Sequence, residues 1–261
     1  MKQTNLFAIA VLILFVSSLK LNAQNSSLED MIKEGKTIAD NAYKMYDRNL
    51  FLKAREVFEQ AYNSDKSNPL PLYHLTYIDE KLLEMSLRKG NEDLFDKYYD
   101  GAVKNAEQLS QTNDWESEGK TILAAIYTYK IANSPMSAIS LSPKVHGLLD
   151  DAQKVNDKNP RSYIIRGIMK YNTPGIFGGS YEEAAKNFSK AVSLFEKQDI
   201  IETLQPTWGY LESLAWLGRS LEKLDNFESA KFAYQKVLSV EPEFSWVKYS
   251  LLPNLEKKIN K

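Results

Sequence analysis

Hydrophobic residues recur every three or four positions along most of this chain, which is the spacing of one face of a helix. Between residues 69 and 160 the stripes continue without interruption by any strand signal, so no β-strand is required. We predict an all-α fold of about ten helices in five hairpins. The expected hairpins cover residues 28–62, 69–110, 114–156, 160–197 and 206–240, and in the third the second helix is expected to follow Pro143.

A comb of small and aromatic residues repeats at three places, each in the expected second helix of a hairpin. The residues are four and then three positions apart, so they lie on one helix face. Three copies at one spacing indicate an internal repeat. The copies are Ala54, Phe58 and Ala61, then Ala184, Phe188 and Ala191, and finally Ala230, Tyr234 and Val237.

The segment from Leu211 to Pro242 carries the most complete copy. Its first helix aligns Leu214, Leu217, Gly218 and Leu221 on one face, ahead of the comb that begins at Ala230. This segment resembles the tetratricopeptide (TPR) repeat, and the resemblance implies a right-handed α-solenoid. Small residues at 218 and 230 would let the paired helices approach closely. The last segment, Phe244 to Lys261, is expected to form a capping helix that Pro253 either kinks or splits.

The N-terminus predicts a secretory leader. Lys2 precedes an apolar run from Leu6 to Leu19, which is too short to span a bilayer comfortably, and Lys20 ends it. Small Ala23 fits the residue before a cleavage site, so we expect residues 1–23 to be a signal peptide and residues 24–261 to be the TPR-like helical domain. An uncleaved signal anchor is the alternative. The expected location is periplasmic or secreted, with no stable membrane span after cleavage.

Composition narrows the chemistry further. The 33 basic and 34 acidic residues leave a net charge of −1, so no strong field favours nucleic acid. There is no cysteine, which excludes disulfides and thiolate sites, and the two histidines, His74 and His146, exclude a histidine-rich metal site. We therefore predict no metal, no cofactor and no nucleic-acid partner. The oligomeric state does not follow from the sequence.

No constellation of catalytic residues emerges. Acidic pairs such as Glu182-Glu183 fit helix starts and solvated faces better than acid-base chemistry. His74, on a helix rich in Tyr and Leu, is expected to point into a groove or to bond a backbone carbonyl. We predict no catalytic residues and no enzyme activity.

Two irregular segments interrupt the repeats, at residues 172–180 and 198–208. In the first, Pro174 and three glycines are expected to reverse the chain while Ile176 and Phe177 tuck against the helices. A ligand site in this loop is the open alternative. In the second, Trp208 is expected to pack. The motifs TPGIFGG, PTWGYLESLAWLG and FSWVKYSLLPNLEK also resemble a group of small secreted bacterial TPR proteins of uncharacterised role.

The TPR resemblance implies a concave groove lined by the first helix of each hairpin, and a groove of this kind binds extended peptides or a folded protein. We therefore predict a noncatalytic scaffold that binds a protein or peptide. The alternatives are an accessory subunit for extracytoplasmic solute transport, which would hold a small ligand or a solute-binding protein, and a helical enzyme. The candidate groove residues are Lys36, Tyr43, Tyr46, Asp47, Arg161, Ile168, Tyr171, Asn172, Arg219, Glu222 and Lys223.

Overall fold

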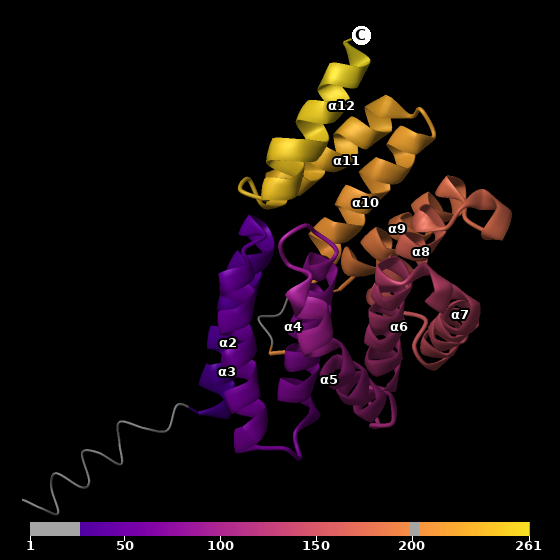
Figure 1. Cartoon of the computed structure of the whole chain (residues 1–261). Coiled ribbons are helices and arrows are strands. Elements are labelled where there is room, and N and C mark those ends of the chain that lie inside the picture. The colour runs from indigo at the N-terminus through magenta and orange to yellow at the C-terminus, as the bar shows by residue number, and fades with distance from the viewer. Residues whose placement is uncertain (1–26, 199–203, 261) are drawn as a thin grey trace, which may run out of the picture.

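The computed structural model describes residues 27–198 and 204–260, and this part of the chain is helical throughout, without a strand. The predicted leader, residues 1–23, lies outside the described residues. Five antiparallel hairpins follow one another (Figure 1), as predicted. They are α2 (Leu28–Met45) with α3 (Arg48–Ser64), α4 (Pro69–Ser86) with α5 (Asp93–Ser110), α6 (Glu116–Asn133) with α7 (Ala138–Val155), α8 (Pro160–Asn172) with α9 (Tyr181–Phe195), and α10 (Tyr210–Lys223) with α11 (Phe227–Val240).

Asparagine side chains cap the N-termini of three helices. Asn68 and Asn159 cap α4 and α8 by accepting a hydrogen bond from a backbone N–H, and each is followed by a proline at the first helical position. Asn226 caps α11 in the same way, after Asp225 has taken a left-handed conformation with φ 56°. Hairpin turns and repeat boundaries therefore follow from local side-chain chemistry.

A glycine in three first helices makes room for an aromatic ring of the second helix. A Cβ at Gly35 would lie 2.6 Å from the ring of Phe58, and a Cβ at Gly167 would lie 2.6 Å from the ring of Phe188. Gly218 faces Tyr234 in the same manner. The space saved by the small residue is thus filled by the aromatic member of the comb, and this contact repeats along the stack.

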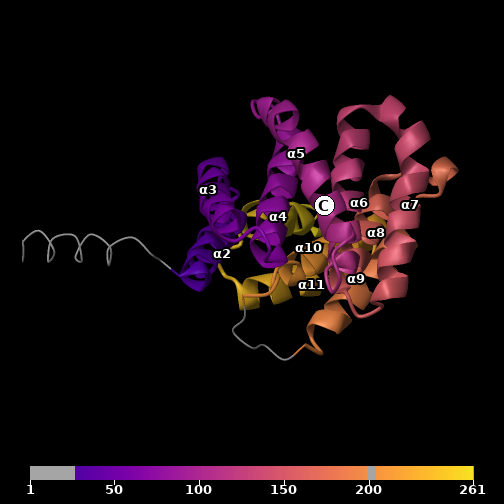
Figure 2. The same ribbon diagram turned by 90° about the horizontal axis from the view of Figure 1, so that it is seen from below.

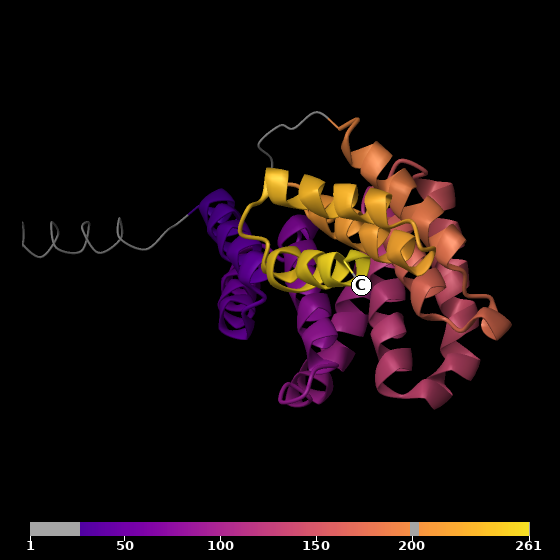
Figure 3. The ribbon, with the colours of Figure 1, turned by 90° about the horizontal axis from the view of Figure 1, so that it is seen from above.

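The array curves so that α4 becomes its centre. Most of α4 is buried, including charged residues on the face that an ordinary solenoid helix turns to solvent. The first helices α2, α4, α6 and α8 lie next to one another along the inner side (Figure 2). Helices α10 and α11 then fold back across this side (Figure 3), and α4 is buried along almost its whole length.

The C-terminal segment closes the array against its first hairpin. A π-helical turn, η3 (Val247–Leu251), leads without a break into α12 (Leu252–Ile259), whose second residue is Pro253. The C-terminal helix is therefore continuous through Pro253, and its irregularity is the π-turn directly before the proline. Before the π-turn, Phe244 contacts Tyr43 with ring centroids 5.4 Å apart. Lys44 pairs with Glu241 at 2.7 Å, so segments from opposite ends of the described chain meet here.

Two local expectations were wrong. Pro143 lies inside α7, which begins at Ala138 after a 3₁₀ turn, η1 (Pro135–Ser137), because that turn already supplies the helix start. Ile176 and Phe177 do not tuck against the helices: their side chains are 87% and 74% exposed. They sit in a second 3₁₀ turn, η2 (Gly175–Phe177), that projects from the array and ends at Gly178 with φ 90°.

Among the described helices, none has the length and apolar character needed to cross a bilayer.

Candidate functional site

The deep inner groove is filled by the chain's own connection between α9 and α10. Residues 204–208 run through it as an irregular segment, and the backbone carbonyls of residues 204–206 accept hydrogen bonds from side chains of the first helices. His74 Nε2 donates to Leu204 O at 2.7 Å, and Lys36 Nζ donates to Gln205 O at 2.6 Å. Arg161 donates to Pro206 O at 2.5 Å. We call residues 204–208 the groove segment.

Trp208 anchors the groove segment. Its indole stacks on Tyr77 with centroids 4.7 Å apart, and its N–H donates to Tyr73 Oη at 2.9 Å. Trp208 therefore packs, as predicted, and His74 bonds a backbone carbonyl, as predicted. Burial lowers the pKa of His74 to about 3, so the ring is neutral and can donate from one nitrogen only. A partner cannot enter this groove while the segment occupies it.

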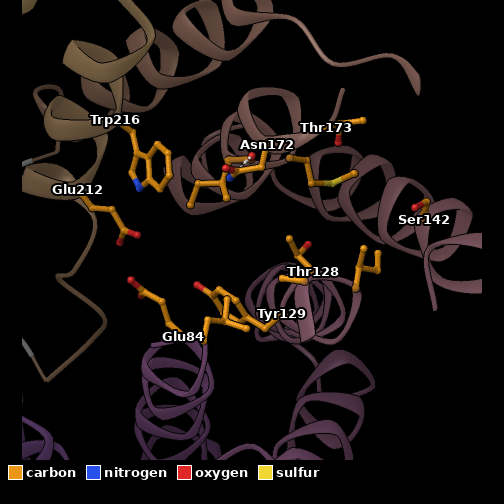
Figure 4. A pocket seen from close by; sticks show the side chains of 13 residues that line it. Glu84, Thr128, Tyr129, Ser142, Asn172, Thr173, Glu212 and Trp216 are labelled. Atoms are coloured by element: carbon orange, nitrogen blue, oxygen red, sulfur yellow. Dashed lines mark hydrogen bonds between the residues drawn. The ribbon is translucent and has the colours of Figure 1, made fainter. Parts of the chain in front are cut away.

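An open cleft remains beside the groove segment, between the C-terminal ends of α4 and α6, helix α8 and helix α10. Its inner part, which we call the apolar chamber, has a volume of about 380 Å³. In Figure 4, Glu84 and Glu212 face each other at one end of this chamber, next to Trp216. Aliphatic and aromatic side chains make up about half of its wall, which is formed by Leu87, Thr128, Tyr129, Ile131, Ala132, Ser142, Ile168, Met169, Asn172 and Thr173 together with those three residues.

A second part of the cleft, the aromatic chamber, has a volume of about 620 Å³ and shares Glu84, Glu212 and Trp216 with the first. It lies between α2, the end of α4, α10 and the π-turn. Six aromatic side chains and two arginines line it, which is an unusual concentration for one surface. The remaining lining residues are Tyr43, Tyr46, Arg88, Arg219, Phe244, Ser245, Trp246, Tyr249, Ser250 and Leu251.

A buried lysine supports the shared wall of the two chambers. Lys81 Nζ lies 3.1 Å from Glu84, 3.4 Å from Glu80 and 3.5 Å from Glu212. Burial raises the pKa of Glu80 to about 7, and it raises the pKa of Glu212 as well. Burial alone would lower the pKa of Lys81, but the three carboxylates reverse this and raise it. The two glutamates of the wall therefore already share a cation.

The two arginines of the aromatic chamber are held by rings instead of carboxylates. The Arg88 guanidinium carbon lies 3.8 Å from the ring centroid of Tyr46. That of Arg219 lies 4.2 Å from the Trp216 ring, 4.8 Å from Tyr171 and 5.6 Å from Trp246. Within residues 27–198 and 204–260, no carboxylate oxygen lies within 4.0 Å of either guanidinium. Their N–H groups are available to a ligand.

Arg219 also borders a third, smaller space of about 240 Å³, which we call the side chamber. This space continues the cleft on the far side of Arg219, toward α12. It is lined by Tyr171, Glu222, Lys223, Leu251, Asn254 and Lys258 together with Arg219. Glu222 is already engaged there, because its carboxylate accepts a hydrogen bond from Tyr234.

The structure divides the predicted groove residues into three groups. Lys36 and Arg161 hold the groove segment, and Asp47 caps α3 by accepting from the N–H groups of Asn49 and Leu50. The others line the cleft: Tyr43, Tyr46, Ile168, Tyr171, Asn172, Arg219, Glu222 and Lys223. Whether these side chains bind a partner stays a prediction.

The aromatic residues of the C-terminal segment were not predicted as part of a site. Trp246 and Tyr249 were assigned to a cap, and Arg88 was not singled out because it follows the end of α4. The only signal in the sequence is the density of aromatic residues in FSWVKY (residues 244–249). Among the described residues there is no group of three or more acidic, histidine or cysteine side chains placed to hold a metal ion.

Comparison with known proteins supports the repeat and the fold. Residues 211–244 match the family model of the tetratricopeptide repeat, the same segment that the spacing singles out. No curated protein sequence shows significant similarity to the chain.

Solved structures share the fold at low sequence identity. The HusA haemophore from Porphyromonas gingivalis is similar with a TM-score of 0.65 and 16% identity, over 77% of this chain and 96% of that one. A thermophilic TPR protein of Thermus thermophilus has a TM-score of 0.59 and 17% identity, over 89% and 96% of the two chains. The APC/C hetero-tetramer Cut9–Hcn1 contains a chain with a TM-score of 0.56 and 13% identity, over 97% of this chain and 46% of that one. These identities establish the fold alone.

Proposed function

We propose that this TPR-repeat protein is a noncatalytic scaffold outside the cytoplasm that binds a segment of a partner protein in the open cleft. The deep groove is filled by residues 204–208, so the binding surface moves to the aromatic chamber beside it. TPR folds commonly present protein-binding surfaces, and this use of the fold supports the proposal.

The aromatic chamber is the observation that carries the proposal. Tyr, Trp and Arg are the residue types that contribute most to protein interfaces, because each buries a large area with few rotatable bonds or offers several donors. Tyr249 is 69% exposed and Trp246 is half-buried, so both have surface left to bury. Tyr46 and Arg88 face them from the first two hairpins.

The proposed location rests on the N-terminal sequence alone. Cleavage after Ala23 would release residues 24–261, which include every described residue. N-terminal sequencing of the protein recovered from its native cell envelope tests this. A chain that starts at residue 24 is expected, and a chain that still carries the apolar run would favour the signal anchor.

Two exposed aromatic residues give a matched test of the binding surface. Tyr249→Ala removes a ring at the edge of the aromatic chamber, whereas Phe232→Ala removes an equally exposed ring from α11, 68% exposed and outside the cleft. A partner captured from envelope extract is expected to bind Tyr249→Ala at least tenfold more weakly, since an interface hot spot contributes about 2 kcal/mol. Phe232→Ala is expected to bind as the unmodified protein does. Equal binding by both variants would exclude the cleft as the protein-binding surface.

A small-ligand role is the second candidate, as in solute uptake. Two observations favour it: the fold likeness to a haemophore, and a cleft with an apolar chamber of about 380 Å³ beside an aromatic one, within the size range of ligand sites. Titration of the purified protein with haem, followed by absorbance, tests this role. A saturable spectral change that Trp246→Ala weakens would support the small-ligand role. Absence of any spectral change would exclude haem as the ligand.

A further inference from the structure

Arg219 stands out because it is rigidly placed yet has no anionic partner among the described residues. It emerges from the middle of α10 and is half-buried between the rings of Trp216, Tyr171 and Trp246. Contact with three rings restricts the movement of the guanidinium while leaving it without a carboxylate partner, so little side-chain entropy remains to be lost on binding. This is the arrangement of an arginine prepared to bind a planar anion.

The acidic residues near Arg219 are already engaged. Glu84 and Glu212 share Lys81, and Glu222 accepts from Tyr234. Three further cationic side chains border the same cleft: Arg88 in the aromatic chamber, and Lys223 and Lys258 in the side chamber. Lys258 lies 3.8 Å from Asp225, whereas Arg88, Lys223 and Arg219 have no carboxylate within 4.0 Å among the described residues. The cleft therefore offers unpaired positive charge at Arg219.

We propose that Arg219 binds the side-chain carboxylate of an Asp or Glu within the partner segment, while an apolar or aromatic residue next to that acid packs against Trp246 and Tyr249. This inference rests on the proposed protein-binding function and names the chemistry of the partner. Arg219 borders both the aromatic chamber and the side chamber, so the partner chain can continue past it in both directions. That geometry favours an acid inside a segment over a terminal carboxylate.

The chemistry of the guanidinium also bears on the ligand group. A planar carboxylate can accept two parallel hydrogen bonds from the edge of a guanidinium. Glu84, Glu212 and Glu222 line the two chambers that meet at Arg219 and offset part of the positive charge there. One singly charged carboxylate therefore suffices to balance Arg219, and it is the ligand group that we expect.

Peptide display tests the inference directly. The probe is a random dodecapeptide library selected on immobilised protein comprising residues 24–261. Peptides with Asp or Glu beside an aromatic or large aliphatic residue are expected to be enriched. Each enriched peptide is then synthesised with an acetylated N-terminus and an amidated C-terminus, so that only side-chain carboxylates remain.

Binding of these peptides to matched variants identifies the residue that binds the acidic side chain. Arg219→Gln is expected to weaken binding about tenfold to a hundredfold, the range for a charged hydrogen bond pair. Arg219→Lys keeps the charge but loses the planar set of N–H donors. It should therefore bind the peptides more tightly than Arg219→Gln and more weakly than the unmodified protein. Lys190→Gln removes one positive charge from the exposed face of α9 and should leave binding unchanged. Thermal unfolding of each variant reports whether its fold is intact.

Several outcomes would overturn the inference. These are enrichment without acidic residues, equal binding to Arg219→Gln, tighter binding of a phosphoserine peptide than of its Glu counterpart, or binding that requires a free C-terminus. If peptides fail in any of these ways while partner capture still depends on Tyr249, the scaffold function stands and only the acidic specificity is wrong. If capture is insensitive to Tyr249, the proposed function itself fails.

Discussion

At the scale of single residues, the fold depends on glycines that accept an aromatic ring from the neighbouring helix. A Cβ at Gly218 would overlap the ring of Tyr234, which is fully buried and donates its hydroxyl to Glu222. The ring has no room to retreat, because protein interiors are close-packed. Elsewhere in the chain a helical glycine has no such role: Gly147, exposed on α7, has open space where a Cβ would be.

This contrast predicts opposite effects of the same substitution. Gly218→Ala should lower the free energy of unfolding by about 1–3 kcal/mol, the cost of overpacking a core. Gly147→Ala should raise it by roughly 0.5–1 kcal/mol, because alanine loses less backbone entropy in a helix and meets no neighbour. Urea unfolding of the two variants measures both changes. Stabilisation by Gly218→Ala would show that the Tyr234 ring can move away.

At the scale of elements, the groove segment is held by side chains instead of by secondary structure. Its carbonyls are bound by His74, Lys36 and Arg161, and its indole by Tyr73 and Tyr77. His74 is 4% exposed and also stacks on Phe58 at 4.9 Å. The packing of the segment therefore requires a neutral imidazole at this position.

The requirement for neutral His74 predicts how stability depends on pH. The pKa of His74 is lowered by burial to about 3 in the folded protein, against about 6.5 in an unfolded chain. Between these values only the unfolded state takes up the proton, so stability is lost as pH falls from about 6.5 toward 3. Burial raises the pKa of Asp79 to about 6 and that of Glu80 to about 7. Above pH 4.5 these two carboxyl groups therefore increase stability as pH falls, which opposes the effect of His74.

A His74→Gln variant separates these contributions. Glutamine can still donate to Leu204 O but does not titrate, so the variant should lose less stability than the unmodified protein between about pH 6.5 and about pH 4. Asp79 and Glu80 are present in both proteins, and their contributions cancel in the difference. Urea unfolding at several pH values measures it. Parallel curves for the two proteins would mean that His74 is accessible to protons in the folded state.

The helices and hairpins were predictable from the sequence, whereas the contacts between distant hairpins were not. Helix starts at Asn68 and Asn226 and the comb at Ala230 are local signals, and each hairpin follows from them. The cleft depends on residues brought together over long separations, such as Arg88 and Trp246. No spacing rule reports such contacts. The exposed Ile176 and Phe177 were misjudged for a related reason, since hydrophobicity alone does not say whether a loop projects.

At the scale of the whole molecule, closure distinguishes this array from an open solenoid. In an open array each repeat contacts only its neighbours, and stability is close to a sum of local terms. Here Phe244 packs on Tyr43 and Glu241 pairs with Lys44, so the last segment stabilises the first hairpin. Tyr43 and Phe244 also line the aromatic chamber. The proposed partner binding and the closure of the array therefore share these two residues.

Closure predicts that one substitution near the C-terminus will loosen both ends of the chain. Phe244 is 2% exposed, and Phe244→Ala should lower the free energy of unfolding by about 3–5 kcal/mol. Hydrogen exchange of backbone amides should then accelerate in α2 as well as in α11 and α12, because Tyr43 loses its covering ring. Phe232→Ala, on the exposed face of α11, should change neither. Faster exchange confined to α11 and α12 would mean that the array behaves as an open stack, with the first hairpin stable on its own neighbours.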